Sequence, residues 1–76
     1  MEFEKLRAII ADVMNMDESE IKPETTFRED LGADSLDVFQ IITGIEDEFG
    51  VEISEETAKS IETVQDAVDA IQKLRN

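Results

Sequence analysis

The sequence predicts an all-α fold: a small four-helix bundle with three longer helices, one short helix and a long loop between the first two. Apolar residues recur at steps of three and four in three separate segments, which is the spacing of amphipathic helices. The 76 residues suffice for one small domain, and no Cys is available to cross-link it. We therefore expect residues 1–76 to form a single domain in which the helices hold one another.

The first helix is predicted over residues 3–15, where the apolar residues at helical spacing are Phe3, Leu6, Ile10 and Val13. Residues 15–33 are rich in Asp, Glu, Ser and Thr, contain a Pro and a Gly, and are predicted to form an irregular connection. Because so long a loop is unusual in a small domain, we expect parts of it to be anchored in the core. We also expect a short helical turn at residues 29–31, and flanking helices that run in nearly the same direction. The residues placed to anchor the loop are Ile21, Phe27 and Leu31.

The second helix is predicted over residues 35–49. Gly32 interrupts the segment before it, and Asp34 and Ser35 both favour an N-cap, so Ser35 is expected at or just inside the helix start. Asp37 adds negative charge to the first turn, where the helix dipole favours it. The apolar residues predicted to face the core are Val38, Ile41, Ile42, Ile45 and Phe49.

A second, narrower face of this helix carries Leu36, Phe39 and Thr43. The spacing fits two positions for Leu36 and Phe39 equally well, the margin of the core or an exposed apolar contact flanked by acidic residues. Gly44 lies inside the same helix, where Gly costs up to about 1 kcal/mol relative to Ala. Gly44 indicates either close packing or a point at which the helix can deform.

Gly50 is predicted to end the second helix. Ser54 is placed to cap a short helix over residues 55–60, which is too short to be stable alone and is the segment we expect to shift most readily. The final helix is predicted to start at Thr63, with Asp66 completing a weak capping box. Its predicted core residues are Val64, Ala67, Val68, Ile71 and Leu74.

The charge is strongly acidic, with 20 Asp and Glu against 7 Lys and Arg and a net charge of −13. Such a surface argues against binding to nucleic acid, which needs Lys and Arg to neutralise phosphates, and against an anionic membrane. It favours a protein partner with a basic patch. The small size and the charge also favour a monomer.

His, Cys, Tyr and Trp are all absent. This composition excludes a Ser-His or Cys-His nucleophilic pair and a His- or Cys-based metal site, so we expect a carrier without a metal site, not an enzyme. No apolar run approaches the roughly 18 residues of a membrane span, and no signal peptide follows Met1. We therefore expect a cytoplasmic protein that does not insert into membranes.

Four stretches together resemble the acyl carrier protein family: TFRED at 26–30, LGADSLD at 31–37, IEDEFGVEI at 45–53 and TVQDA at 63–67. The resemblance extends over nearly the whole chain. It implies a bundle of three longer helices and one short helix, which agrees with the elements predicted from the residues.

The resemblance implies that Ser35 receives 4′-phosphopantetheine from coenzyme A, through a magnesium-dependent phosphopantetheinyl transferase that also recognises Asp34. The terminal thiol of this arm would carry acyl intermediates as thioesters to acyl-loading, ketosynthase and other enzymes of fatty-acid, polyketide or specialised-lipid biosynthesis. In such carriers the acyl chain can retreat between the helices. The residues placed on the face that binds basic, apolar-edged patches of partner enzymes are Leu36, Asp37, Phe39, Gln40, Glu46, Asp47, Ile53 and Glu56.

Some positions depart from the usual pattern of fatty-acid carriers. Gln40 stands where Glu is typical, and the other departures are Phe39, Thr43, Gly44 and Ser54. A specialised carrier and ordinary variation in a fatty-acid carrier both account for them. The alternative function is an unmodified acidic adaptor that binds basic partners, which the charge alone supports equally well. A calcium-binding loop does not fit, because the order of Asp30, Gly32 and Asp34 does not match the ligand spacing that such a loop needs.

Overall fold

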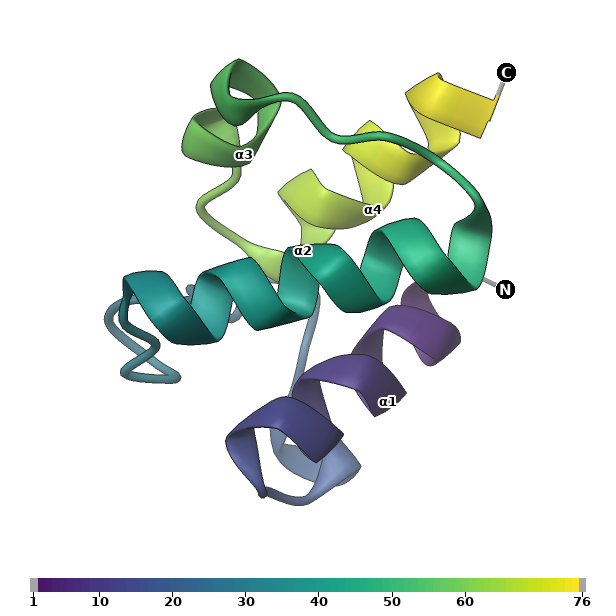
Figure 1. The fold of residues 1–76 in the computed structure, drawn as a ribbon. Helices are drawn as coiled ribbons and strands as arrows, with labels where there is room; N and C mark the ends of the chain where they lie inside the picture. Colours follow the sequence, from purple (N-terminus) through teal and green to yellow (C-terminus); the bar gives the residue numbers. More distant parts are fainter. Residues whose placement is uncertain (1, 76) are drawn as a thin grey trace.

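The computed structural model describes residues 2–75, which form four α-helices and one short 3-10 helix (Figure 1). The elements in order are α1 (Glu2–Met14), η1 (Glu18–Glu20), α2 (Ser35–Phe49), α3 (Glu55–Ser60) and α4 (Val64–Arg75). Three longer helices, one short helix and a long loop between α1 and α2 confirm the predicted all-α bundle. The 3-10 helix η1 has no counterpart among the predicted elements.

Helix α1 runs antiparallel to both α2 and α4 (Figure 1). Lys5, near the start of α1, pairs with Glu48 at the end of α2, with 3.7 Å between Nζ and Oε2. Arg75, at the end of α4, likewise reaches Glu2 at the start of α1, with 3.0 Å between Nη1 and Oε2. The expectation that α1 and α2 run in nearly the same direction is therefore wrong. The long loop between them serves another purpose.

That loop covers one side of the core and is fastened to the start of α4. Ile21 and Phe27 are buried as predicted, whereas Leu31 is only half-buried. The backbone N–H of Phe27 donates to the carbonyl of Glu62 at 3.0 Å, and that of Val64 donates to Thr25 at 2.9 Å. Residues 29–31 form no helical turn of their own and belong instead to a turn that begins at residue 27. The length of the loop is therefore used for burial and for backbone pairing.

Helix α4 begins with the predicted capping box between Thr63 and Asp66. The backbone N–H of Asp66 donates to Thr63 Oγ1 at 3.1 Å, and the backbone N–H of Thr63 donates to Asp66 Oδ2 at 3.2 Å. Asp66 Oδ2 also accepts from the backbone N–H of Glu62 at 3.2 Å. Because the N–H groups of Thr63 and Glu62 stabilise the charged carboxylate, they lower the pKa of Asp66 below its usual value.

The core is a single cluster shared by the three longer helices and the loop. In α2 the fully buried residues are Ile41 and Ile45, while Val38, Ile42 and Phe49 are half-buried, so the buried stripe is narrower than predicted. Leu74 was predicted to face the core but is 45% exposed, because the last turn of α4 lies at the edge of the bundle (Figure 1). The buried apolar residues are Leu6, Ile10, Ile21, Phe27, Ala33, Ile41, Ile45, Val64, Ala67, Val68 and Ile71.

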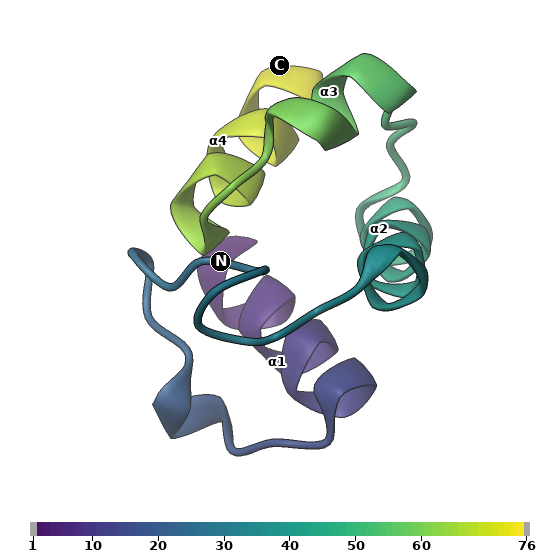
Figure 2. The ribbon, with the colours of Figure 1, turned by 90° about the vertical axis from the view of Figure 1, so that its left-hand side faces the viewer.

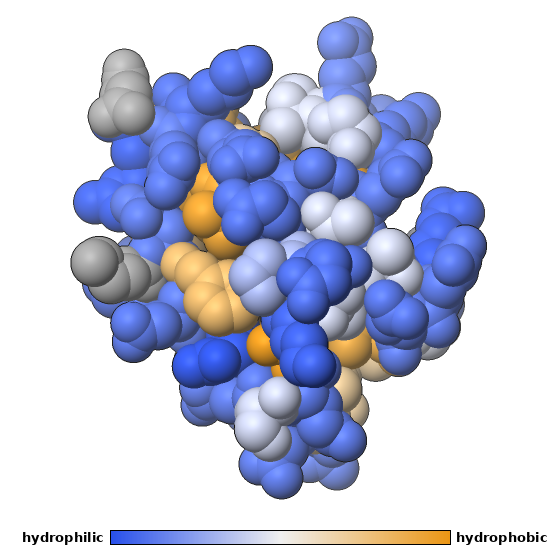
Figure 3. All heavy atoms as spheres, turned by 180° about the vertical axis from the view of Figure 1, so that it is seen from behind, coloured by the Kyte–Doolittle hydropathy of each residue, from blue (hydrophilic) through white to orange (hydrophobic). Residues whose placement is uncertain are grey.

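The view from behind shows a surface made largely of hydrophilic side chains, with small apolar areas between them (Figure 3). This appearance follows from the composition, because 20 acidic and 7 basic side chains must lie mostly in water. No helix within residues 2–75 is both long enough and apolar enough to span a membrane.

Candidate functional site

The start of α2 is built by a capping box that leaves Ser35 free. Asp34 is the N-cap: its Oδ1 accepts from the backbone N–H of Asp37 at 2.9 Å, and its own N–H donates to Asp37 Oδ2 at 3.4 Å. Ser35 is therefore the first residue of the helix, as predicted, and is exposed. Within residues 2–75 its hydroxyl has no hydrogen-bond partner. The side chain is available for reaction because its neighbour does the capping.

Two features of the preceding loop fix this position. Gly32 has φ +66°, a left-handed conformation that Gly adopts without strain and that turns the chain into the helix. The next residue, Ala33, is buried, and its backbone N–H donates to the carbonyl of Phe27 at 2.9 Å. Ser35 is thus anchored to the core from its N-terminal side as well as by α2 itself.

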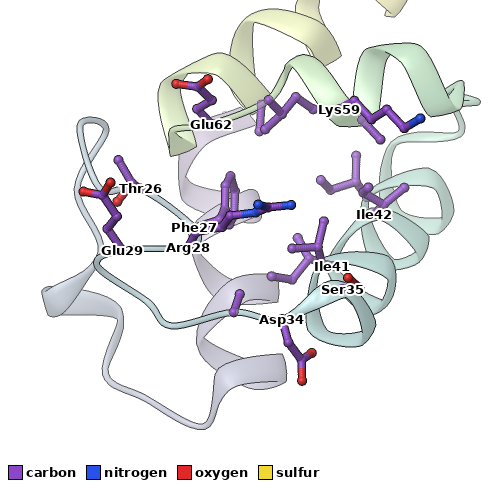
Figure 4. Close-up of a pocket in the computed structure, with 16 residues that line it drawn as sticks. Thr26, Phe27, Arg28, Glu29, Asp34, Ser35, Ile41, Ile42, Lys59 and Glu62 are labelled. Atoms are coloured by element: carbon purple, nitrogen blue, oxygen red, sulfur yellow. The ribbon is translucent and has the colours of Figure 1, made fainter.

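Ser35 lies on the rim of an open cleft of about 1060 Å³ between α2, α3 and the loop before α2 (Figure 4). Its charged lining residues are exposed, whereas its apolar lining residues are buried or half-buried, so the rim is polar and the interior is apolar. Figure 4 shows Ile41 and Ile42 directed from α2 into this space. The apolar residues that line the cleft are Phe27, Ala33, Val38, Ile41, Ile42, Ile45, Ala58, Ile61 and Ala67. Val38 and Ile42 form part of the wall of the cleft, which is why they are only half-buried.

Helix α3 forms the opposite wall and is the least firmly held of the helices. It has six residues, none of them buried, and lies over the space between α2 and α4 (Figure 2). Ser54 is its N-cap, as predicted, and accepts from the backbone N–H of Thr57 at 3.2 Å. A short helix with little buried surface opens at low free-energy cost, so this wall can widen the cleft more easily than α2 can.

The exposed face of α2 carries half of the residues predicted to bind partners. Leu36 and Phe39 are each 64% exposed, which decides between the two positions left open by their spacing in favour of an exposed apolar contact. Gln40 and Asp47 are exposed on the same helix, and Glu56 is exposed on α3.

Three other predicted partner-binding residues also have structural roles. Asp37 belongs to the capping box of α2. Glu46 Oε2 accepts from the backbone N–H of Ile53 at 2.8 Å, so its carboxylate holds the connection between α2 and α3. Ile53 is half-buried and packs against the core. The structure also places two residues on the cleft that were not singled out in the sequence, Arg28 and Lys59. Arg28 lies within the TFRED stretch that carries the family resemblance, but the sequence does not place either residue at a cleft, because the loop and α3 are brought together only by the fold.

Comparison with known proteins gives a consistent result. Residues 4–71 match the family model described as a phosphopantetheine attachment site. An acyl carrier protein from Solidesulfovibrio magneticus is 50% identical over 72 residues, which cover 95% of this chain and 92% of the relative. The crystal structure of the acyl carrier protein from Thermotoga maritima has a TM-score of 0.82 at 34% identity, covering 99% of this chain and 92% of the other. The acyl carrier protein from Enterococcus faecalis gives 0.80 at 37% identity, covering 96% and 92%.

Proposed function

Since this chain belongs to the acyl carrier protein family, whose members are non-catalytic carriers with a 4′-phosphopantetheine group, we propose that Ser35 is the attachment residue. The observation that carries this assignment is the free, exposed hydroxyl of Ser35 beside the capping box, on the rim of an apolar cleft. Attachment forms a bond from Ser35 Oγ to phosphorus and breaks the pyrophosphate bond of coenzyme A, which releases 3′,5′-ADP and the proton of the serine hydroxyl. The arm then supplies a thiol that carries acyl groups as thioesters.

The start of α2 suits a phosphate on Ser35. The first N–H groups of a helix and its dipole both favour negative charge at this end. Asp34 and Asp37 already use part of this capacity in the capping box, and their two bonds do not involve the Ser35 hydroxyl. A phosphodiester on Ser35 therefore extends from the helix without displacing the cap.

The cleft gives the carried acyl group a place away from water. Its interior is lined by aliphatic side chains and Phe27, and Ser35 lies at its rim, so an arm attached there can turn an acyl chain inward. Burial of apolar surface favours this position by about 0.8 kcal/mol per methylene. Widening of the cleft by α3 admits longer chains.

Carriers of this family interact with a phosphopantetheinyl transferase and with biosynthetic enzymes. The docking surface proposed for this chain is the exposed face of α2 with Glu56 of α3, and it combines the apolar Leu36 and Phe39 with the acidic Asp47. Acidic groups around an apolar contact suit acyl-loading enzymes and ketosynthases that present basic patches, because charge complementarity speeds encounter. As part of the same proposal, the chain is a monomeric, cytoplasmic, single-domain carrier that serves fatty-acid or related biosynthesis.

The test is the intact mass after incubation with coenzyme A, Mg²⁺ and a broad-specificity phosphopantetheinyl transferase. We expect wild type to gain the mass of one phosphopantetheine and Ser35→Ala to gain nothing. Ser19→Ala is the matched control, because Ser19 is also exposed but lies on η1, and it should be modified like wild type. A gain on Ser35→Ala would reject Ser35 as the site. No gain on folded wild type, and none already present after purification, would favour the unmodified acidic adaptor.

A further inference from the structure

Two of the few cations of this acidic chain lie on the cleft that Ser35 borders. Arg28 reaches it from the loop and Lys59 from α3. Neither forms an ion pair within residues 2–75, and both are exposed. The cations that do pair with a carboxylate there are Lys5, Arg7 and Arg75. Lys22 and Lys73 form no ion pair within residues 2–75 either, so what distinguishes Arg28 and Lys59 is their place on the cleft.

The direction of the Arg28 side chain sets it apart from Lys59 and from the carboxylates nearby. The Lys59 side chain extends from α3 with its ammonium group directed away from Arg28, so Lys59 only adds positive charge at the edge of the cleft (Figure 4). Figure 4 shows the Arg28 guanidinium pointing into the cleft toward α2, whereas the carboxylates of Glu29 and Glu62 point away from its centre. The Asp34 carboxylate also points away and is engaged by the backbone of α2. An anion that turns into the cleft from Ser35 therefore faces the Arg28 guanidinium. Apolar walls reduce the hydration of such a pair, which strengthens the attraction.

We propose that Arg28 forms an oxyanion site of the cleft, with Lys59 adding positive charge at its edge, and that this site binds a negatively charged group borne on the arm attached to Ser35. Two groups have this chemistry: the phosphodiester of the arm itself, and a carboxylate on the carried acyl group. A guanidinium offers a planar pair of N–H donors that matches either group. The inference rests on the proposed function, because the anion reaches the cleft only through the arm.

Because the anionic group is tethered to Ser35 by the arm, a weak ion pair is enough to change the fraction of it held in the cleft. An exposed ion pair changes an equilibrium by up to about fivefold. A group on a short arm is already present at a high effective concentration, so that factor acts directly on the fraction held in the cleft. If the site binds the carboxylate, an acyl group with a terminal carboxylate is then retained more than a hydrocarbon chain of equal length.

The experiment loads wild type with the arm from coenzyme A, hexanoyl-coenzyme A or adipoyl-coenzyme A. The last two give chains of equal length without and with a terminal carboxylate. Loading is verified first by intact mass, so a failure of the proposed function is seen before the oxyanion site is tested. The same three forms are made of Arg28→Gln/Lys59→Gln and of the charge-matched control Lys22→Gln/Lys73→Gln, whose residues are exposed and do not line the cleft.

Two measurements identify the bound group. The first is the rate of thioester cleavage by hydroxylamine, which falls when the acyl group is held in the cleft. If the site binds the carboxylate, the adipoyl-to-hexanoyl rate ratio rises by up to about fivefold in Arg28→Gln/Lys59→Gln and stays at the wild-type value in the control. The second is the ³¹P chemical shift of the arm. If the site binds the phosphodiester, this shift changes in all three forms of Arg28→Gln/Lys59→Gln and the rate ratio does not.

Either pattern supports the oxyanion site and names its ligand. If both measurements agree between Arg28→Gln/Lys59→Gln and Lys22→Gln/Lys73→Gln, the two cleft cations act only through net charge and the inference is wrong. The substituted residues are exposed, so all variants should fold, and the far-ultraviolet circular dichroism of each loaded protein checks this directly.

Discussion

Replacing Gly44 by Ala tests how closely α1 and α2 are packed. A Cβ at position 44 would lie 2.9 Å from Cγ2 of Ile9 on α1. Ala is favoured over Gly inside a helix by about 1 kcal/mol. Overpacking costs about 1–3 kcal/mol, and Ile9 cannot easily turn its methyl away because β-branched side chains in helices keep one χ1 rotamer. We therefore expect Gly44→Ala to lower the free energy of unfolding by about 1 kcal/mol.

A double-mutant cycle separates the two effects. Ile9→Ala removes Cγ2, so in that background Gly44→Ala should raise the free energy of unfolding by about 1 kcal/mol, the helix-propensity gain alone. The coupling between positions 9 and 44 is then about 2 kcal/mol. Ile9→Val is the matched control, because it shortens the side chain but keeps the methyl that meets position 44.

Urea denaturation with linear extrapolation measures these differences. All variants must be compared at one ionic strength, because a net charge of −13 makes the stability depend on salt. The reasoning would be refuted if Gly44→Ala stabilised the protein equally with Ile, Val or Ala at position 9. Equal gains would mean that α1 and α2 leave room for a methyl group at this contact.

Two further predictions concern carboxylates with structural roles. Because the pKa of Asp66 is lowered by folding, its contribution to stability is present above its unfolded pKa of about 4 and is lost as the pH falls through the lower folded pKa. The gap in free energy of unfolding between wild type and Asp66→Ala should therefore close on acidification, and a gap that is constant down to pH 2 would show that the carboxylate charge is not the cause. Asp47→Lys should slow association with a basic partner at low salt and leave the Tm unchanged, whereas Glu46→Lys should also lower the Tm, because Glu46 holds the N–H of Ile53. Equal Tm values for the two variants would show that this bond contributes nothing to stability.

Signals within a few residues of one another predicted most of the helix boundaries. Gly50, with φ +65°, ends α2 and donates its N–H to Glu46 at 2.9 Å. Ser54 caps α3, and the box between Thr63 and Asp66 starts α4. Each feature involves groups at most four residues apart, so the sequence order alone brings them together. The same holds for Ser35, whose place in the first turn follows from Asp34 beside it.

The exposure of individual side chains, the directions of the helices and the residues that line the cleft depended on contacts between segments far apart in the sequence. Periodicity identifies the apolar face of α2 but not how far its edges are covered, which is why it left Leu36 and Phe39 undecided and placed Leu74 in the core. The antiparallel course of α1 and α2 could not be read from the loop length, because the bond from Phe27 to Glu62 joins residues far apart in the chain. The position of Arg28 on the cleft could not be predicted for the same reason, since only the fold brings this residue close to Ser35.

Asp34 offers a way to separate folding from recognition at the attachment site. Its Oδ1 accepts the N–H of Asp37, a bond that an Asn side chain can also accept, because Asn and Asp are about equally good N-caps. Asp34→Asn should therefore change the free energy of unfolding by only a few tenths of a kcal/mol, whereas Asp34→Ala, which loses the cap, should cost about 1 kcal/mol. If the transferase recognises the charge of Asp34, Asp34→Asn must slow modification of Ser35 although the fold is intact. Modification of Asp34→Asn at the wild-type rate, with only Asp34→Ala impaired, would mean that Asp34 serves the site as a helix cap alone.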